Sequence, residues 1–232
     1  MKTIGLLGGM SWESTAVYYR LINEDVKRRL GGLHSAEIVL VSIDFEPMEK
    51  LQRSGGWAEA ARILIEGARR LEAAGAELLL ICANTMHKVA DDVARAVHIP
   101  LVHIADAAAE AVTTSGFSRV GLLGTRFTME DDFYRERLAE RHGLEVTVPD
   151  EHDRQVVHAI IYDELCRGEV RDASRQEVVR IIETLSTRGA QGVILGCTEL
   201  PLLIGDDDVW VKVFDTTAIH AARAVQLALA QA

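Results

Sequence analysis

The chain lacks the features that mark a membrane protein or a disulfide scaffold. Its 232 residues contain no apolar run near the roughly 20 residues that a membrane-spanning helix requires. Met1–Met10 has no small-residue cleavage site after it and predicts a first strand, not a signal peptide. The three cysteines are an odd number with no C-x-x-C pair. We therefore expect no membrane anchor and no disulfide framework, and a reducing cytoplasm as the compartment.

The chain also lacks an excess of positive charge. The chain has 25 Lys and Arg against 35 Asp and Glu, a formal net charge of −10. A nucleic-acid-binding surface or a polybasic membrane patch requires an excess of positive charge. The composition therefore argues against nucleic acids and membranes as partners.

Nucleotide and metal motifs are missing as well. Gly5–Met10 matches neither G-x-G-x-x-G nor the phosphate loop G-x-x-x-x-G-K-[ST], and no H-E-x-x-H occurs. His152 and His158 lack metal-ligand spacing. We expect neither a bound nucleotide nor a metal.

What is present is an alternation of apolar runs with helical patterns. With 48% hydrophobic residues, the chain can fill one large core or two lobes of roughly 100 residues each. A polar loop is expected around Glu46-Pro47 and Ser54–Gly56. Helices are expected after Ser11 or Ser14 and over Trp57–Ala74, Lys88–Val97 and Ala107–Ser115. Strands are expected over Thr3–Leu7, Glu37–Phe45, Glu77–Cys82, Leu101–Ile104 and Arg119–Leu123. The alternation predicts an α/β fold with mostly parallel sheets.

The pattern occurs twice. The sequence GLLG at Gly5–Gly8 recurs at Gly121–Gly124, and the strand Leu78–Thr85 aligns with Gly192–Glu199. These matches at nearly constant offset predict two pseudo-symmetric, doubly wound lobes. We expect residues 1–105 with 216–232 in the first lobe and 106–215 in the second.

Ligands of open α/β sheets bind beyond the carboxyl ends of the strands. We therefore expect the active site in the cleft between the lobes. Four strand-end loops should reach it: Gly8–Ser11, Ala83–Thr85, Gly124–Arg126 and Cys197–Glu199.

Cys197 is the most informative of these residues. It follows the apolar run Val193–Leu195 and Gly196, and Pro201 stands near the first turn of the next helix. Helix N–H groups stabilise an anion, so this thiol is expected to ionise more readily than an ordinary one. Such a thiolate suits a nucleophile, a base or an anion-binding group. The plainer alternative is a small buried cysteine that packs a strand end.

Three motifs together resemble one protein family. Gly8–Ser14 (GGMSWES), Ala83–Lys88 (ANTMHK) and Gly196–Glu199 (GCTE) are similar to the aspartate/glutamate racemase superfamily, above all to its broad-specificity amino-acid racemase branch. The resemblance covers essentially the whole chain. It implies an isomerase that acts on a free amino acid without pyridoxal phosphate or any other cofactor, and a homodimer.

The resemblance also exposes a departure. In that family two acid/base residues, usually both cysteines, flank the substrate α-carbon, and the broad-specificity branch has threonine at the first position. Cys197 matches the second position, but Ala83 occupies the first, and a methyl group carries no proton. Cys82 is adjacent, although strand alternation points it to the opposite face.

Several explanations for Ala83 stay open. The chain is a disabled racemase variant, or water or another residue serves that side. Otherwise it is a one-base isomerase or decarboxylase of the same superfamily, or a catalytically silent amino-acid binder.

The remaining candidates bind substrate. The resemblance places Asn84, Thr85 and Thr198 on the substrate carboxylate and Gln52, in the loop after the second strand, at a substrate-contacting position. Met10 and Ser11 should line the pocket floor, and pseudo-symmetry makes Thr125 a carboxylate donor. Glu199 either orients Cys197, binds the amino group or only places charge at a helix start. A second carboxylate has two candidate partners, Arg53 and Arg126. His87 and Lys88 are expected at a helix start or on the surface.

Overall fold

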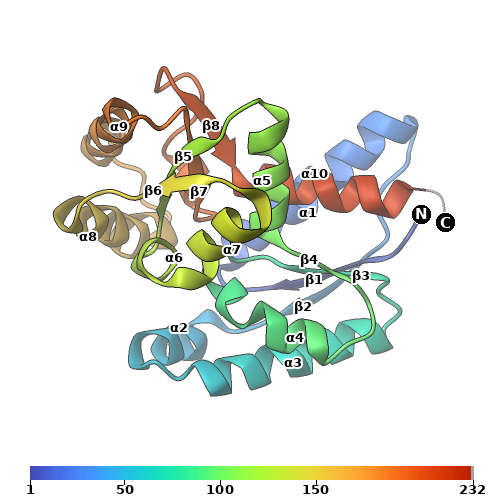
Figure 1. Cartoon of the computed structure of the whole chain (residues 1–232). Coiled ribbons are helices and arrows are strands. Elements are labelled where there is room, and N and C mark those ends of the chain that lie inside the picture. The colour runs from blue at the N-terminus through green and yellow to red at the C-terminus, as the bar shows by residue number, and fades with distance from the viewer. Residues whose placement is uncertain (231–232) are drawn as a thin grey trace. The chain divides into compact units, whose positions relative to one another are not determined.

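The computed structural model describes residues 1–230 and divides into two compact units. Met1–Ile104 and the segment from His220 onward form unit 1, and Ala105–Ile219 forms unit 2. Each unit contains one four-stranded parallel sheet with helices, which confirms the predicted α/β class (Figure 1). No helix among the described residues is long and apolar enough to cross a membrane.

Unit 1 orders its strands β2-β1-β3-β4. Its strands are β1 (Ile4–Gly8), β2 (Ile38–Ser42), β3 (Leu78–Ile81) and β4 (Leu101–Val102). Its helical segments are α1 (Trp12–Leu30), α2 (Phe45–Ser54), α3 (Trp57–Ala73), the 3₁₀ turn η1 (Thr85–Val89), α4 (Ala90–Arg95) and most of α10 (Thr216–Leu229). The helix α5 (Ile104–Thr114) starts at the boundary to unit 2.

Unit 2 repeats this order as β6-β5-β7-β8, so the predicted repeat is visible in the topology. Its strands are β5 (Arg119–Gly124), β6 (Glu145–Thr147), β7 (Gly192–Gly196) and β8 (Lys212–Asp215). Its helical segments are α6 (Arg126–Glu130), α7 (Asp132–His142), α8 (Glu151–Ala159), the π-helix η2 (Ile160–Glu164), the 3₁₀ turn η3 (Leu165–Arg167), α9 (Asp172–Thr187) and the 3₁₀ turn η4 (Leu200–Leu202).

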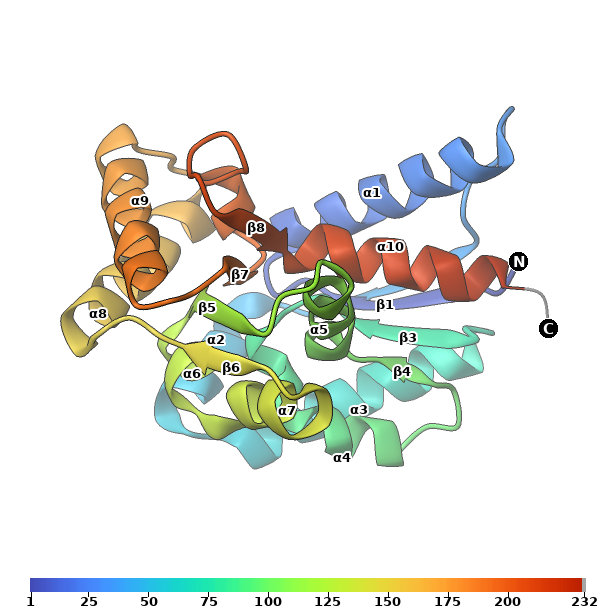
Figure 2. The same ribbon diagram turned by 45° about the horizontal axis from the view of Figure 1, so that its top comes forward.

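In unit 1 the central strands are buried on both faces, as a parallel sheet requires. Successive side chains alternate between the faces, so Leu7, Leu79 and Ile81 pack with α3 while Leu6 and Leu80 pack with α1 and α10. Figure 2 shows α1 and α10 on one face of this sheet and α3 and α4 on the other. The alternation continues past β3, so Cys82 and Ala83 lie on opposite faces of the sheet.

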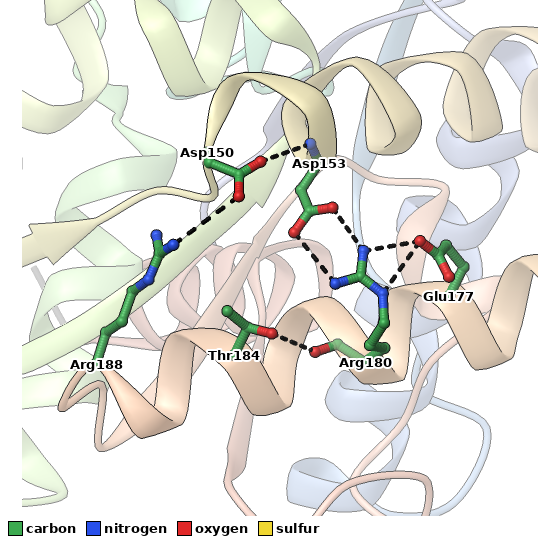
Figure 3. A network of polar contacts seen from close by, with 6 residues as sticks. All are labelled: Asp150, Asp153, Glu177, Arg180, Thr184 and Arg188. Atoms are coloured by element: carbon green, nitrogen blue, oxygen red, sulfur yellow. Dashed lines mark hydrogen bonds and ion pairs between the residues drawn. The ribbon is translucent and has the colours of Figure 1, made fainter.

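A polar cluster joins the start of α8 to the middle and the end of α9 in unit 2 (Figure 3). Asp150 caps α8 by accepting the Asp153 N–H at 3.0 Å. The buried Asp153 carboxylate accepts from the Arg180 guanidinium of α9, with Nη2 to Oδ1 at 2.5 Å. Arg180 also donates to Glu177 at 2.7 Å, and Arg188 lies 3.9 Å from Asp150. This cluster attaches α8 to α9 and contains none of the sequence-predicted site residues.

The polar loop expected around Glu46-Pro47 is wrong, because Phe45–Ser54 forms the helix α2, and only Gly55 and Gly56 connect it to α3. Asp44 caps the helix by accepting the Glu46 N–H, and Pro47 falls in the first turn, where no intrahelical N–H is lost. Met48 and Gln52, four residues apart, are both buried. Gln52 therefore comes from a helix and not from a loop.

The segment after β3 also differs from expectation. The sequence predicts a helix over Lys88–Val97, but the chain forms the 3₁₀ turn η1 and then the six-residue helix α4. The strand expected over Leu101–Ile104 stops at Val102, because Ile104 already begins α5. Both differences lie at element boundaries, where periodicity is least informative.

Candidate active site

In unit 1, two candidate segments follow neighbouring strands. β1 and β3 pair in parallel with Leu7 beside Ile81, so the chain leaves the same sheet edge after both strands. Met10 and Ser11 follow β1, and Ala83 and Asn84 follow β3. All four side chains are buried. The structure thus places these four residues at one edge of the unit 1 sheet.

The turn after β1 depends on glycine. Gly9 has φ +89°, and its N–H donates to the Thr15 Oγ1 at 2.8 Å. Thr15 in turn donates to the Ser11 carbonyl at 2.8 Å. Ser11 caps α1 by accepting the Ser14 N–H, so of the two predicted capping serines it is Ser11 that acts. Ser11 therefore stands at the positive end of a 19-residue helix.

Unit 2 repeats this arrangement around threonine. Thr125 caps α6 by accepting the Thr128 N–H at 3.3 Å. Thr128 packs on the strand ends, where a Cβ added to Gly124 or Gly196 would lie within 3.1 Å of it. Because Gly124 pairs with Gly196, Thr125 and Cys197 follow adjacent strands of one sheet.

Cys197, Thr198 and Glu199 form a buried hydrogen-bonded group. The Cys197 thiol donates to Glu199 Oε2 at 3.1 Å, and the Thr198 hydroxyl donates to the same oxygen at 2.9 Å. All three side chains are less than a tenth exposed. Glu199 is therefore placed to hold the thiol, one of the roles predicted for it.

The expectation of a readily ionised thiol is wrong for Cys197. Burial raises its pKa well above the ordinary value, and the negative charge of Glu199 raises it further. The segment that follows is the three-residue turn η4, which aligns too few peptide dipoles to offset burial. Cys197 is therefore a protonated thiol with a carboxylate beside it, and its ionisation requires a proton acceptor.

Ala83 and Cys82 face different sides of their sheet. Ala83 belongs to the core under α3, whereas Cys82 belongs to the core under α1 and α10. Cys82 is fully buried, and burial strongly raises the pKa of its thiol. It is a packed, protonated side chain that lies away from the Ala83 face.

His87 is buried, against the expectation of a surface or capping role. Its Nδ1 lies 2.9 Å from the Ala83 carbonyl oxygen, and its Nε2 accepts the Ile104 N–H at 3.2 Å. The signal available in the sequence was the apolar setting of His87, between Met86 and Val89. Lys88 is half-buried, with its Nζ 4.3 Å from the Trp57 ring centroid.

The remaining candidates divide by exposure. Gln52 is buried and donates from Nε2 to the Met86 Sδ at 3.0 Å, and Thr85 is buried as well. Arg53 and Arg126 are exposed. Arg53 pairs with Glu49 on α2, with Nε to Oε1 at 2.8 Å, and the Arg126 guanidinium lies 5.6 Å from the Phe127 ring centroid. Among residues 1–230, no three His, Cys, Asp or Glu side chains form a group that could hold a metal.

Two solved structures are similar to this chain over nearly its whole length. A solved structure of a candidate Asp/Glu racemase from Yersinia pestis is 55% identical, with a TM-score of 0.92 over 99% of this chain and 100% of that one. An aspartate racemase homologue from Pyrococcus horikoshii is 43% identical, with a TM-score of 0.84 over 98% and 99% of the two chains.

A relative in Bacillus subtilis is named broad specificity amino-acid racemase RacX. It is 22% identical over 98% of both chains. The profile described as Asp/Glu/hydantoin racemase matches residues 7–224. The chain belongs to the Asp/Glu/hydantoin racemase family.

Proposed function

We propose that the chain acts on the α-carbon of a free amino acid without pyridoxal phosphate, with Cys197 as its acid/base residue. The single observation that carries the proposal is the buried Cys197–Glu199 hydrogen bond at the end of a central strand. Family membership and the name of the RacX relative support an amino-acid racemase.

In this proposal Glu199 accepts the proton of Cys197, and the thiolate then removes the α-proton of the substrate. Burial and the charge of Glu199 both raise the pKa of Cys197 above the ordinary thiol value of about 8.5, so Cys197 stays protonated until the Glu199 carboxylate accepts its proton during the reaction. The negative charge that develops on the substrate must be held by prearranged donors. The proposed donors are Asn84, Thr85, Thr125 and Thr198. Met10, Ser11 and Gln52 complete the proposed substrate-binding set.

Ala83 limits the reaction. Racemisation requires a proton donor on each face of the α-carbon, and a methyl group is not one. We therefore propose that this sequence exchanges the α-hydrogen of one enantiomer with solvent faster than it inverts the centre. Ala83 also favours two other candidates, a one-base isomerase or decarboxylase of the same family and a silent amino-acid binder.

Deuterium exchange tests the proposal. Each enantiomer of aspartate, glutamate and alanine is incubated with the protein in D₂O, and loss of the α-proton signal is followed by NMR. We expect exchange in one enantiomer, its loss in Cys197→Ala, and added racemisation in Ala83→Thr and Ala83→Cys. Equal racemisation of both enantiomers by the unmodified sequence would contradict the role assigned to Ala83.

The same samples separate the alternatives. A silent binder would raise the melting temperature with an amino acid, by mass action, and yet exchange no α-proton. A one-base decarboxylase would release carbon dioxide from a substrate that carries a second carboxylate, for which Arg53 and Arg126 are the proposed partners.

We further propose a homodimer that works in a reducing cytoplasm. The family resemblance supports the dimer, and the odd number of cysteines without a C-x-x-C pair supports the compartment. Light scattering coupled to size-exclusion chromatography measures the mass directly. A mass of one 25.5 kDa chain would contradict the dimer.

A further inference from the structure

One residue binds two successive carbonyl oxygens of the segment after β3. The His87 side chain contacts the Ala83 carbonyl oxygen, with Nδ1 at 2.9 Å. The His87 backbone N–H donates to the Asn84 carbonyl oxygen at 3.0 Å. Both carbonyl groups of this candidate segment are thus tied to the same position in η1.

The hydrogen-bond partners define the protonation of the His87 ring. A carbonyl oxygen can only accept, so Nδ1 carries the hydrogen that is donated to Ala83. The Ile104 N–H can only donate, so Nε2 carries none and accepts. The neutral Nδ1–H tautomer satisfies both contacts and connects the segment after β3 to the first residue of α5.

These contacts affect how well the segment after β3 could bind the carboxylate of a substrate, which is an anion. A carbonyl oxygen directed at a carboxylate repels it, whereas N–H and hydroxyl groups attract it. The Ala83 and Asn84 carbonyl oxygens both contact His87, so the lone pairs of both oxygens are used in hydrogen bonds within unit 1. The Cys82 carbonyl oxygen has its own donor, the Ser14 hydroxyl at 3.5 Å.

The His87 ring is itself held by packing. It is 3% exposed, and its centroid lies 4.5 Å from that of His103 and 6.0 Å from that of His220. His220 accepts from the Tyr18 hydroxyl at 2.9 Å and donates to the Val102 carbonyl at 2.8 Å. A ring confined in this way keeps its donor directed at Ala83.

We propose that His87 is a positioning residue, which fixes the Ala83–Thr85 backbone so that Asn84 and Thr85 receive the α-carboxylate of the substrate. This inference rests on the proposed function and deepens it. His87 acts through the segment and touches no reacting atom.

Three variants test the inference. His87→Asn retains an amide donor near the position of Nδ1, whereas His87→Leu has similar bulk and no donor. Tyr18→Phe is the matched control, because it removes the buried hydrogen bond between Tyr18 and His220 in the same histidine cluster and leaves the His87 side chain with its contacts to Ala83 and Ile104. The first readout is α-proton exchange of glutamate in D₂O as a function of its concentration.

We expect His87→Leu to raise the half-saturating glutamate concentration at least tenfold with a maximal rate within about threefold of the parent. His87→Asn should restore most of the affinity, and Tyr18→Phe should lower the melting temperature without changing the half-saturating concentration. An unchanged half-saturating concentration in folded His87→Leu would overturn the inference, as would an equal rise in Tyr18→Phe.

Amide hydrogen exchange separates this inference from the proposed function. If the parent chain exchanges no α-proton, the proposed function fails. The exchange rates of the backbone amides of residues 83–89 can still be measured, and they test whether His87 holds this segment in place. Faster amide exchange there in His87→Leu than in Tyr18→Phe supports the positioning role. Equal protection in both variants overturns it.

Discussion

Glu199 Oε2 lies 3.1 Å from the Cys197 Sγ and accepts a hydrogen bond from the thiol, and both side chains are buried. The same oxygen accepts from Thr198 at 2.9 Å. The carboxylate thus has a fixed orientation before any substrate arrives. Within unit 2, the contact between Cys197 and Glu199 thus places a proton donor directly beside an acceptor.

Glu199→Gln should lower α-proton exchange about 100-fold, because a positioned base contributes about 10²–10⁴ in rate. The amide keeps the size of the side chain and can still contact Thr198, so folding should be retained. The measurement is the exchange rate of the reactive enantiomer at saturating glutamate. Activity near that of the parent would show that Cys197 loses its proton to another group.

Alkylation of Cys197 should depend on pH in a defined direction. Burial and Glu199 raise the thiol pKa, so the thiolate fraction and the rate of reaction with iodoacetamide should still be rising above pH 9. In Glu199→Gln the charge that contributes to this shift is gone, and the profile should move toward lower pH. Mass spectrometry of the alkylated peptide gives both profiles. A plateau below pH 8 would contradict the raised pKa.

Folding stability should also fall at high pH through Cys82. Burial raises its folded-state pKa, so the unfolded chain releases this proton first. The stabilisation is complete below the unfolded value of about 8.5 and is lost by about 1.4 kcal/mol per pH unit above it. Urea unfolding of the parent and of Cys82→Ala at pH 7, 9 and 10 isolates this effect. The stability advantage of the parent should shrink as pH rises, and a constant difference would contradict it.

The sequence predicts the α/β class and the internal repeat because both depend on patterns that a single chain displays. GLLG at Gly5–Gly8 and Gly121–Gly124 marks equivalent strands β1 and β5, and the sheets share one strand order. Strand alternation also separates Cys82 from Ala83 correctly. Periodicity and glycine spacing are local properties, so they can be recognised before the fold is known.

Side-chain environments were harder to predict, because they depend on residues far apart in the chain. The sequence places Gln52 in a polar loop after the second strand, yet Phe45–Ser54 is a capped helix with Pro47 in its first turn. The pKa of Cys197 was expected to fall because Pro201 indicates a helix start. That segment is a short 3₁₀ turn, and the depth of burial around Cys197 is set by the whole unit 2 core.

The turn after β1 should tolerate no side chain at Gly9. Gly9 has φ +89°, and a Cβ there would lie 2.1 Å from the Ile43 carbonyl oxygen. Gly75 is the matched control, since its φ is +92° and nothing lies within 4 Å of an added Cβ. Gly75→Ala should cost about 1 kcal/mol from backbone strain alone. Gly9→Ala should cost at least about 3 kcal/mol, because the overlap adds to that strain.

Thermal unfolding of the two variants measures this difference. If the Gly9→Ala variant still folds, it should also bind glutamate more weakly, because Gly9 directly precedes the proposed substrate-binding residues Met10 and Ser11. Equal melting temperatures for Gly9→Ala and Gly75→Ala would show that the turn moves freely and does not hold Ser11 in place.

The attachment of α8 to α9 should depend on Arg180 far more than on Arg188 (Figure 3). The Asp153 side chain is 6% exposed, and removing Arg180 takes away the guanidinium that pairs with it. Arg180 is 46% exposed, so water can replace part of this contact, and we expect Arg180→Ala to cost about 1–2 kcal/mol, below the 3–5 kcal/mol of a fully buried pair. Arg188→Ala removes only an exposed contact at 3.9 Å and should cost less than about 0.5 kcal/mol. Urea unfolding of both variants at pH 7 gives the comparison, and a larger loss in Arg188→Ala would show that Asp153 is solvated without its partner.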